Sequence, residues 1–501
     1  MTTKVKTKLG VLVGARRKTQ NGFEYDDFLN IPYAKPPVGY LRFKSPQPPD
    51  PWQGERNSTV YSESNLCIQY DLFKRIPRGS EDCLYINVST PKVPTVGLLM
   101  HLLPVMVFIH GGGFFFGNGL AKFENGPDYL IEHNVVVVTM NYRLSALGFL
   151  ALDIPEASGN MGLKDQALAL KWVQENIADF GGNKDDVTIF GIGAGAASVE
   201  YHVISPLSTG LFHKAIMQSG SVLNPWAIET SNKIKDLAFK LARNLNYQGK
   251  GLYYGFVPTI EQHFGYGEAF LTEIPYDLLT SGRFNKVPVM RGFTDSEGFI
   301  ISGLKPQDIK EITMLQNYVD YWRFPFNTST DTYYYNERFR HVYNTYKGND
   351  TERPAIDFFG DFEFVSGIII SSKLMVKNAV PVYLYEFSYD GTLNLIKAAS
   401  RVTKKGAGHA DDTAYTILIE PRRNLTQNDV TVRDRISTMW TNFAKFSNPT
   451  PNISNLLPLY WPPYSTGEQF LMIINKDLST CSKYAEERIQ LFEDIMRKYH
   501  R

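Results

Sequence analysis

The sequence has little of three things: cysteine, net charge and long apolar runs. Its 501 residues include three cysteines, which allow one disulfide and leave one thiol over. A formal net charge of +1 provides no field for binding nucleic acid or an anionic membrane. The short basic clusters at 16–18 and 404–405 are expected in solvated loops. No apolar run reaches the ~18 residues of a membrane-spanning helix, so no membrane span is expected.

The first ten residues, MTTKVKTKLG, are polar and contain no signal-peptide core. We expect a secreted protein without its leader, with a cytoplasmic protein as the alternative. Six N-x-S/T sequons favour secretion and a glycoprotein; they begin at Asn57, Asn87, Asn327, Asn349, Asn424 and Asn452.

Runs rich in Val and Ile alternate with segments of helical periodicity. Strands are expected at residues 105–109, 135–140, 187–190, 214–218, 287–290 and 382–385. Helices with one apolar stripe are expected at residues 163–179, 234–241 and 432–443. This alternation is typical of a mostly parallel central sheet flanked by helices on both faces. No repeat or long linker divides the chain, so residues 1–501 are expected to form one α/β domain.

A glycine-rich turn, Gly191-Ile192-Gly193-Ala194-Gly195-Ala196, follows the expected strand at 187–190. It fits either a dinucleotide-binding turn or a nucleophile elbow, G-x-S-x-G, in which Gly193 stands in place of the serine. A dinucleotide site normally has an acidic residue about 20 positions on, at the end of the next strand. The strand at 214–218 is followed by no Asp or Glu before Glu229. The elbow is favoured, and no cofactor or metal is expected.

Three other segments support the elbow. His110-Gly111-Gly112-Gly113-Phe114 follows a strand and resembles a loop whose backbone N–H groups stabilise an oxyanion. Glu297 follows the strand at 287–290, and His409 lies in a loop flanked by glycines. Each alone has an ordinary interpretation: a tight turn, a surface turn and a capping histidine. Positions 193, 297 and 409 nevertheless follow the chain order of an α/β-hydrolase triad.

Further motifs give a family resemblance. They are Asn30-Ile-Pro-Tyr-Ala-Lys-Pro-Pro-Val38, Glu81-Asp-Cys-Leu-Tyr-Ile-Asn-Val88, Asn141-Tyr-Arg-Leu144, Gly162-Leu-Lys-Asp-Gln166 and Phe180-Gly-Gly-Asn183. From about residue 9 to about residue 495, the chain resembles the type-B carboxylesterase/cholinesterase family of α/β-hydrolases. The resemblance implies the α/β-hydrolase fold and the chemistry of a carboxylic ester hydrolase.

The resemblance also implies roles for individual residues. Glu297 and His409 occupy the acid and base positions of the triad, and Gly112, Gly113 and the amide of Ala194 match the oxyanion donors. Other matches are structural: a disulfide between Cys67 and Cys83, and ion pairs of Arg42 with Glu81 and of Arg143 with Asp165.

Three departures from the family affect the expected chemistry. Gly193 replaces the nucleophilic serine, Ile192 replaces the acidic residue before it, and the chain is shortened around 247–251, without the cysteines of the acyl-pocket disulfide. Glycine cannot form an acyl-enzyme. Loss of the serine in subtilisin costs about 2 × 10⁶ in kcat, on the order of 8–9 kcal/mol. Ser198, one helical turn further on, matches a buried position of the family.

We therefore expect a protein that binds a carboxylic ester or an apolar ligand with little or no turnover. Two alternatives remain open: an active carboxylic ester hydrolase with an altered nucleophile codon, and a non-catalytic adhesion or partner-binding member of the family. Two hypotheses follow from the departures. A water beside Gly193, activated by His409, hydrolyses esters slowly, and Ile192 makes the floor of the pocket less suited to cations.

Overall fold

The computed structural model describes residues 2–71, 76–94, 101–119, 126–243, 255–264, 268–302, 329–343, 352–419 and 424–499. The shortened segment at 247–251 lies outside the described residues, as do the sequons at Asn327 and Asn349. No helix in the described ranges is long and apolar enough to cross a membrane.

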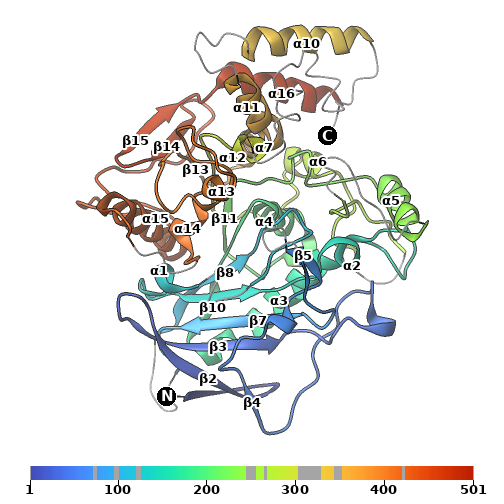
Figure 1. The fold of residues 1–501 in the computed structure, drawn as a ribbon, viewed down its shortest axis with the longest axis vertical. Coiled ribbons are helices and arrows are strands. Elements are labelled where there is room, and N and C mark those ends of the chain that lie inside the picture. The colour runs from blue at the N-terminus through green and yellow to red at the C-terminus, as the bar shows by residue number, and fades with distance from the viewer. Residues whose placement is uncertain are drawn as a thin grey trace.

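A 13-stranded sheet runs through the molecule (Figure 1). Its strands follow the order β1-β2-β3-β7-β9-β8-β10-β11-β12-β13-β14-β15, and β4 pairs with β2. Their bounds are β1 Thr2–Thr7, β2 Gly10–Lys18, β3 Glu24–Pro32, β4 Glu55–Asn57, β7 Tyr85–Thr90, β8 Leu103–Ile109, β9 Val136–Met140, β10 Gly182–Ile192, β11 Lys214–Gln218, β12 Val289–Thr294, β13 Val382–Phe387, β14 Phe470–Ile474 and β15 Leu478–Ser482. A separate hairpin joins β5 (Gln69–Asp71) to β6 (Ile76–Arg78).

The centre of the sheet is parallel and its edges are antiparallel. Every pairing from β9 through β8 and β10 to β14 is parallel, whereas β1, β2, β3 and β7 pair antiparallel at one edge and β15 at the other. Because the carboxyl ends of parallel strands meet at one edge of a sheet, the loops after β8, β10, β11 and β12 are neighbours there.

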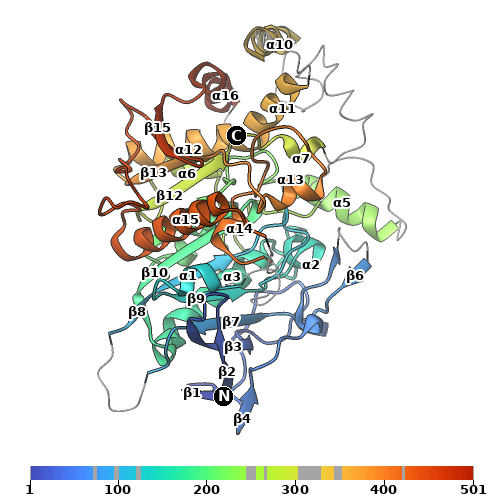
Figure 2. The same cartoon turned by 60° about the vertical axis from the view of Figure 1, so that its left-hand side comes forward.

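Helices cover both faces of the sheet. One face carries α3 (Met161–Asn176), α4 (Ala194–Ile204) and α12 (Ser366–Lys377), and the other carries α1 (Asp128–Ile131), α14 (Thr413–Thr416) and α15 (Gln427–Phe446) (Figures 1 and 2). The first core lies between the sheet and α3, α4 and α12, and the second core lies between the sheet and α1, α14 and α15. Along β8, Val105, Val107 and Ile109 pack into the first core, whereas Met106 and Phe108 pack into the second. This alternation follows from the two-residue period of a strand, and it requires apolar residues at every position.

Local sequence signals explain where the main helix of the second face begins. Thr426 precedes α15, its side chain accepts a hydrogen bond from the N–H of Asp429, and the Asp429 carboxylate accepts one from the N–H of Thr426. This capping box satisfies donors that would otherwise lack partners at the helix start.

The fold class predicted from the sequence is confirmed, and the differences are local. The expected strands and helices are all present, although β12 begins at Val289, two residues later than expected. The expectation of a solvated loop at Arg16–Lys18 is wrong: these residues lie in β2, where Arg16 pairs with Asp26 at 2.9 Å and Arg17 with Asp27 at 2.7 Å. The three consecutive basic residues resembled a solvated turn because the aspartates that pair with Arg16 and Arg17 lie 10 positions further along the chain, in the next strand.

Additional helices complete the described part of the fold. They are α5 (Ser231–Arg243), α6 (Pro275–Thr280), α7 (Phe299–Ser302), α10 (Ser329–Tyr343), α11 (Arg353–Gly360), α13 (Leu395–Ala399) and α16 (Glu486–Tyr499). Figure 2 shows α10 and α16 far from the N-terminal strands. Between α11 and α12, a π-helical turn at Asp361–Val365 carries Phe364 towards the histidine of the candidate site.

Candidate active site

Gly193 occupies a sharp turn between β10 and α4. Its φ of +54° and ψ of −117° fall where a residue with a side chain is strained, as in a nucleophile elbow. The turn is held by a hydrogen bond from the N–H of Gly193 to the carbonyl of Gln218, at 2.8 Å. A Cβ added at Gly193 would lie 3.1 Å from Nε2 of His409, and that ring is the one group of the described residues within 4 Å.

His409 and Glu297 form a hydrogen-bonded pair beside this turn. Nδ1 of His409 lies 2.7 Å from Oε2 of Glu297, which fixes the ring so that Nε2 faces Gly193. The Glu297 side chain is fully buried, while 15% of the His409 side chain is exposed. The structure thus brings together positions 193, 297 and 409, which the sequence singled out. Glu297 and His409 are 112 positions apart in the chain.

Ser219 is a further residue of the site, and the sequence analysis did not assign it a role. Its hydroxyl donates to Oε1 of Glu297 at 2.5 Å, and the N–H of Thr294 donates to the same oxygen at 2.8 Å. Both oxygens of the carboxylate are therefore engaged, which holds Glu297 in one orientation. The available signal was position: Ser219 directly follows β11, as the other site residues follow their strands.

The expected oxyanion donors lie in the loop after β8 and at the start of α4. Within the described residues, the N–H groups of Gly112 and Gly113 donate to no protein acceptor. Ala194 is the first residue of α4, so its amide has no carbonyl acceptor within the helix. The loop and the elbow are in backbone contact, since a Cβ added at Gly111 would come 2.4 Å from the carbonyl oxygen of Ile192. The arrangement offers free donors beside an empty nucleophile position.

An aromatic ring packs on the histidine. The ring of Phe364 packs on His409 with centroids 4.3 Å apart, and the ring of Trp226 packs on Phe364 at 5.9 Å. Ile192 is buried in the second core and brings no charge to the elbow.

Ser198 is fully buried and accepts a hydrogen bond from Gln166, so its hydroxyl is directed into the protein interior.

Three charged side chains hold the loop that delivers His409. The N–H of Ala407 donates to Asp295 and that of Gly408 to Asp411, both at 2.7 Å, while the Lys397 ammonium donates to the carbonyl of Gly406 at 2.9 Å. Burial raises the pKa of Asp295 to about 6. Asp412, buried under the elbow, accepts from Gln218 and Tyr385, and burial raises its pKa to about 6 as well.

Two further buried contacts support the elbow from below. Glu200 of α4 and Arg291 of β12 form a two-pronged ion pair at 3.0 and 3.1 Å, and both side chains are fully buried. The hydroxyl of Ser371 donates to the same carboxylate. This pair ties the helix that starts at the elbow to the strand that leads to Glu297.

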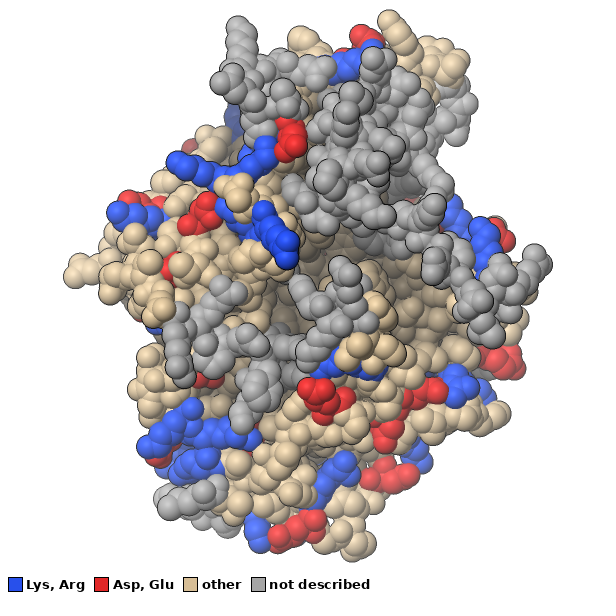
Figure 3. All heavy atoms as spheres, viewed as in Figure 1, with Lys and Arg blue, Asp and Glu red and all other residues tan. Residues whose placement is uncertain are grey.

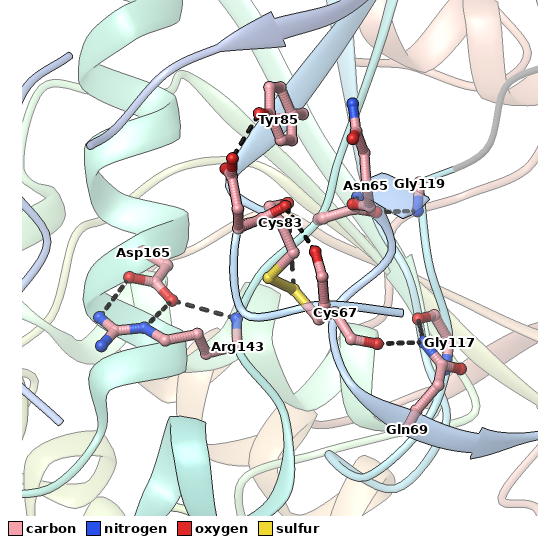
Figure 4. Close-up of a disulfide and its surroundings, with 12 residues drawn as sticks. Asn65, Cys67, Gln69, Cys83, Tyr85, Gly117, Gly119, Arg143 and Asp165 are labelled. Carbon is pink, nitrogen blue, oxygen red and sulfur yellow. Dashed lines mark hydrogen bonds and ion pairs between the residues drawn. A yellow bond between two sulfur atoms is a disulfide. The ribbon is translucent and has the colours of Figure 1, made fainter. Parts of the chain in front are cut away.

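The structural pairs implied by the resemblance are present. Cys67 and Cys83 are joined by a disulfide, and Arg143 and Asp165 form a buried ion pair beside it (Figure 4). Arg42 and Glu81 pair at 2.6 Å. Cys481 is a free cysteine.

The surface over the site is concave. Figure 3, in the orientation of Figure 1, shows the molecule hollowed over the region where α4 lies, with basic and acidic side chains interspersed on this face.

Comparison with known proteins agrees with this geometry. Residues 1–252 and 247–492 match the sequence profile of the carboxylesterase family. The chain is 35% identical over 509 aligned positions to juvenile hormone esterase of Tribolium castaneum, covering 89% of this chain and 84% of that protein. It is also 35% identical over 491 aligned positions to pyrethroid hydrolase Ces2a of Mus musculus, covering 89% of this chain and 83% of that one.

Solved structures include a similar molecule. The crystal structure of juvenile hormone esterase from Manduca sexta, with OTFP covalently attached, superposes with a TM-score of 0.86 at 28% identity, covering 99% of this chain and 100% of that one. The central parallel sheet and the flanking helices are those of an α/β-hydrolase. On sequence and structure together, the chain belongs to the carboxylesterase family.

Proposed function

We propose that this protein binds carboxylic esters in the pocket of an ester hydrolase and releases them with little or no turnover. The observation that carries the proposal is the empty position at Gly193, directly facing Nε2 of His409. Esters are the expected ligands because free backbone donors at Gly112, Gly113 and Ala194 suit a carbonyl oxygen, and because Phe364 and Trp226 provide apolar surface.

In any residual hydrolysis, water would attack the ester itself, without an acyl-enzyme intermediate. The Nδ1 of His409 is engaged by Glu297, so Nε2 is the free base of the ring. A water in the space left by the missing side chain can lose a proton to Nε2 while its oxygen attacks the ester carbonyl. Collapse of the tetrahedral adduct then breaks the acyl C–O bond, and the leaving alkoxide takes the proton back from Nε2 and departs as the alcohol. In serine-protease sites that lack a triad member, the oxyanion donors and substrate binding alone still give roughly 10³–10⁴-fold over water. We expect native turnover near that level.

Secretion is part of the same proposal. The exposed sequons at Asn57, Asn424 and Asn452 are compatible with a glycoprotein that meets its ligands outside the cell. A secreted ester binder without turnover would sequester its ligand, and mass action would set how much is held.

The test uses one ester and its matched ether. Calorimetric titration of the native protein with 4-nitrophenyl butyrate and with 4-nitrophenyl butyl ether compares ligands of similar shape with and without the carbonyl. We expect the ester to bind about 2- to 10-fold more tightly, the worth of one ordinary hydrogen bond. Nitrophenolate release is followed in parallel, with His409→Ala as the control that removes the base.

The outcomes separate the candidate functions. Native turnover near the typical enzyme kcat of about 10 s⁻¹ would show that another nucleophile replaces the serine and would refute the impairment. Equal binding of ester and ether would mean that the carbonyl is not recognised, which favours a partner-binding role. Residual hydrolysis that survives His409→Ala would exclude the activated-water route.

A further inference from the structure

The loop that carries the oxyanion donors closes on itself. It leaves β8 at His110 and ends its tight turn at Gly117, where φ is +113°. A Cβ added at Gly117 would lie 2.4 Å from Nδ1 of His110 and 2.5 Å from the carbonyl oxygen of Gly111. Because the end of the loop abuts its beginning, a shift of Gly117 displaces the backbone from which Gly112 and Gly113 project.

A single side chain holds Gly117 by both of its backbone groups. Oε1 of Gln69 accepts from the N–H of Gly117 at 2.9 Å, and Nε2 of Gln69 donates to the carbonyl of Gly117 at 2.8 Å (Figure 4). Among the described residues, no other side chain forms a hydrogen bond with the backbone of Gly117. Nε2 also donates to the carbonyl of Cys67 at 3.1 Å, so the Gln69 carboxamide uses both of its N–H groups.

Gln69 is itself anchored by the disulfide. It lies two residues after Cys67, which is bonded to Cys83 across a sequence separation of 16. The base of this ring is further closed by hydrogen bonds from the N–H of Ser80 to Leu66 and from its hydroxyl to Ser64. The ring closed by the Cys67–Cys83 disulfide therefore restrains the backbone of Gln69. The Gln69 side chain in turn restrains Gly117 of the oxyanion loop through its two hydrogen bonds.

The far end of the loop has its own attachments. The N–H of Gly119 donates to Asn141 at 2.8 Å, and its carbonyl accepts from Asn87 at 2.7 Å. Gly119 is thereby fixed to β7 and to the residue that follows β9. Gly117 is left as the point where the disulfide ring and the oxyanion loop are joined.

We propose that Gln69 is a positioning residue for the oxyanion donors, acting through Gly117 and anchored by the Cys67–Cys83 disulfide. The inference rests on the proposed function in so far as those donors bind the ester carbonyl. Gln69 acts on the transition state more than on the ground state, because the oxyanion needs the donors within about 2.7–3.1 Å, whereas an apolar ester body does not.

The test needs a reporter with turnover, and Gly193→Ser provides one. In that background we compare Gln69→Met, which keeps the side-chain volume and removes the hydrogen bonds, with Gln174→Met. Gln174 is a matched control because its Nε2 also donates to two backbone carbonyls, of Lys184 and Leu211, at a site away from the elbow. For 4-nitrophenyl butyrate we expect kcat to fall about 10- to 100-fold in Gln69→Met, with KM within twofold, since small misplacements cost this much. Gln174→Met should change neither value.

A second readout is independent of turnover. In the native background, hydrogen–deuterium exchange of the peptide spanning 110–119 should speed up in Gln69→Met and in the double variant Cys67→Ser/Cys83→Ser, and not in Gln174→Met. If Gly193→Ser is silent, the view that only the nucleophile is missing fails, while the exchange result still decides the role of Gln69; failure of the proposed function itself would appear separately, as equal binding of ester and ether by the native protein. Unchanged exchange, or a kcat as high in Gln69→Met as in Gln174→Met, would refute the positioning role.

Discussion

Replacing Gly193 by serine should raise the rate of ester hydrolysis and lower the melting temperature. The new side chain supplies the nucleophile and at the same time strains the backbone of the turn. The backbone at 193, with φ of +54° and ψ of −117°, costs a residue with a side chain about 1–3 kcal/mol. At about 2.1 cal/mol/K per residue, the 501 residues give an unfolding entropy of about 1 kcal/mol/K. We therefore expect Tm to fall by about 1–3 °C.

The gain in rate follows from the nucleophile. Removing the serine of subtilisin costs about 2 × 10⁶ in kcat. Here the new Cβ would lie 3.1 Å from Nε2 of His409, so the ring has to retreat by a few tenths of an ångström before the hydroxyl can bond to it. This misfit reduces the recovery, and we expect Gly193→Ser to release nitrophenolate about 10³- to 10⁵-fold faster than the native protein.

Gly193→Ala is the matched control, because it carries the same backbone strain and no hydroxyl. Both variants should melt at the same lower temperature by differential scanning calorimetry, and Gly193→Ser alone should gain turnover. Equal, low rates in the two variants would contradict the reasoning that the nucleophile is the one missing part. A Tm unchanged from the native protein would contradict the strain argument.

Three further predictions concern charge and modification. Ile192→Glu should strengthen binding of a quaternary ammonium ligand, measured by calorimetry with tetramethylammonium, and no change would refute the view that Ile192 disfavours cations. Burial raises the pKa of Glu386 to about 7 from 4.5, so this group stabilises the fold fully below pH 4.5 and loses that contribution as pH rises through 7. Glu386→Gln should therefore gain about 3 kcal/mol relative to the native protein between pH 4.5 and pH 8 in urea unfolding, and a pH-independent difference would refute this. In protein secreted from insect cells, Asn57→Gln should lose a glycan by mass spectrometry and Asn87→Gln should not, because Asn87 is buried and its amide donates to Gly119; a glycan on Asn87 would contradict the buried geometry.

Much of the site was predictable because its residues follow strands. The elbow, Glu297 and the loop after β8 each lie just past the end of a buried strand, and parallel strands bring such ends to one edge of the sheet. His409 had the weakest local signal, since it lies 22 positions beyond Phe387 at the end of β13, and only its flanking glycines and its place after positions 193 and 297 distinguished it from a capping histidine.

Residues whose roles depend on distant partners were not predictable. Ser219 bonds Glu297 across 78 positions, and Gln69 bonds Gly117 across 48. Neither residue belongs to a local motif that carries a mechanism, and both are polar residues of ordinary frequency beside strands. The same holds for the buried pair of Glu200 and Arg291, which lie 91 positions apart in the chain. Each charge needs the other because an unpaired buried charge is costly, but no local pattern in the sequence indicates that they meet.

The parallel order of the sheet also determines when the pocket can appear during folding. Gln218 beneath the elbow bonds Asp412 and Trp440, which lie 194 and 222 positions further along the chain. Contacts of such separation form late, because the entropy of closing long loops is lost before they contribute. In stopped-flow refolding, helical circular dichroism should therefore recover before the capacity to bind an ester. Ligand binding would then report completion of the native topology, and a chain truncated ahead of His409 should never acquire it.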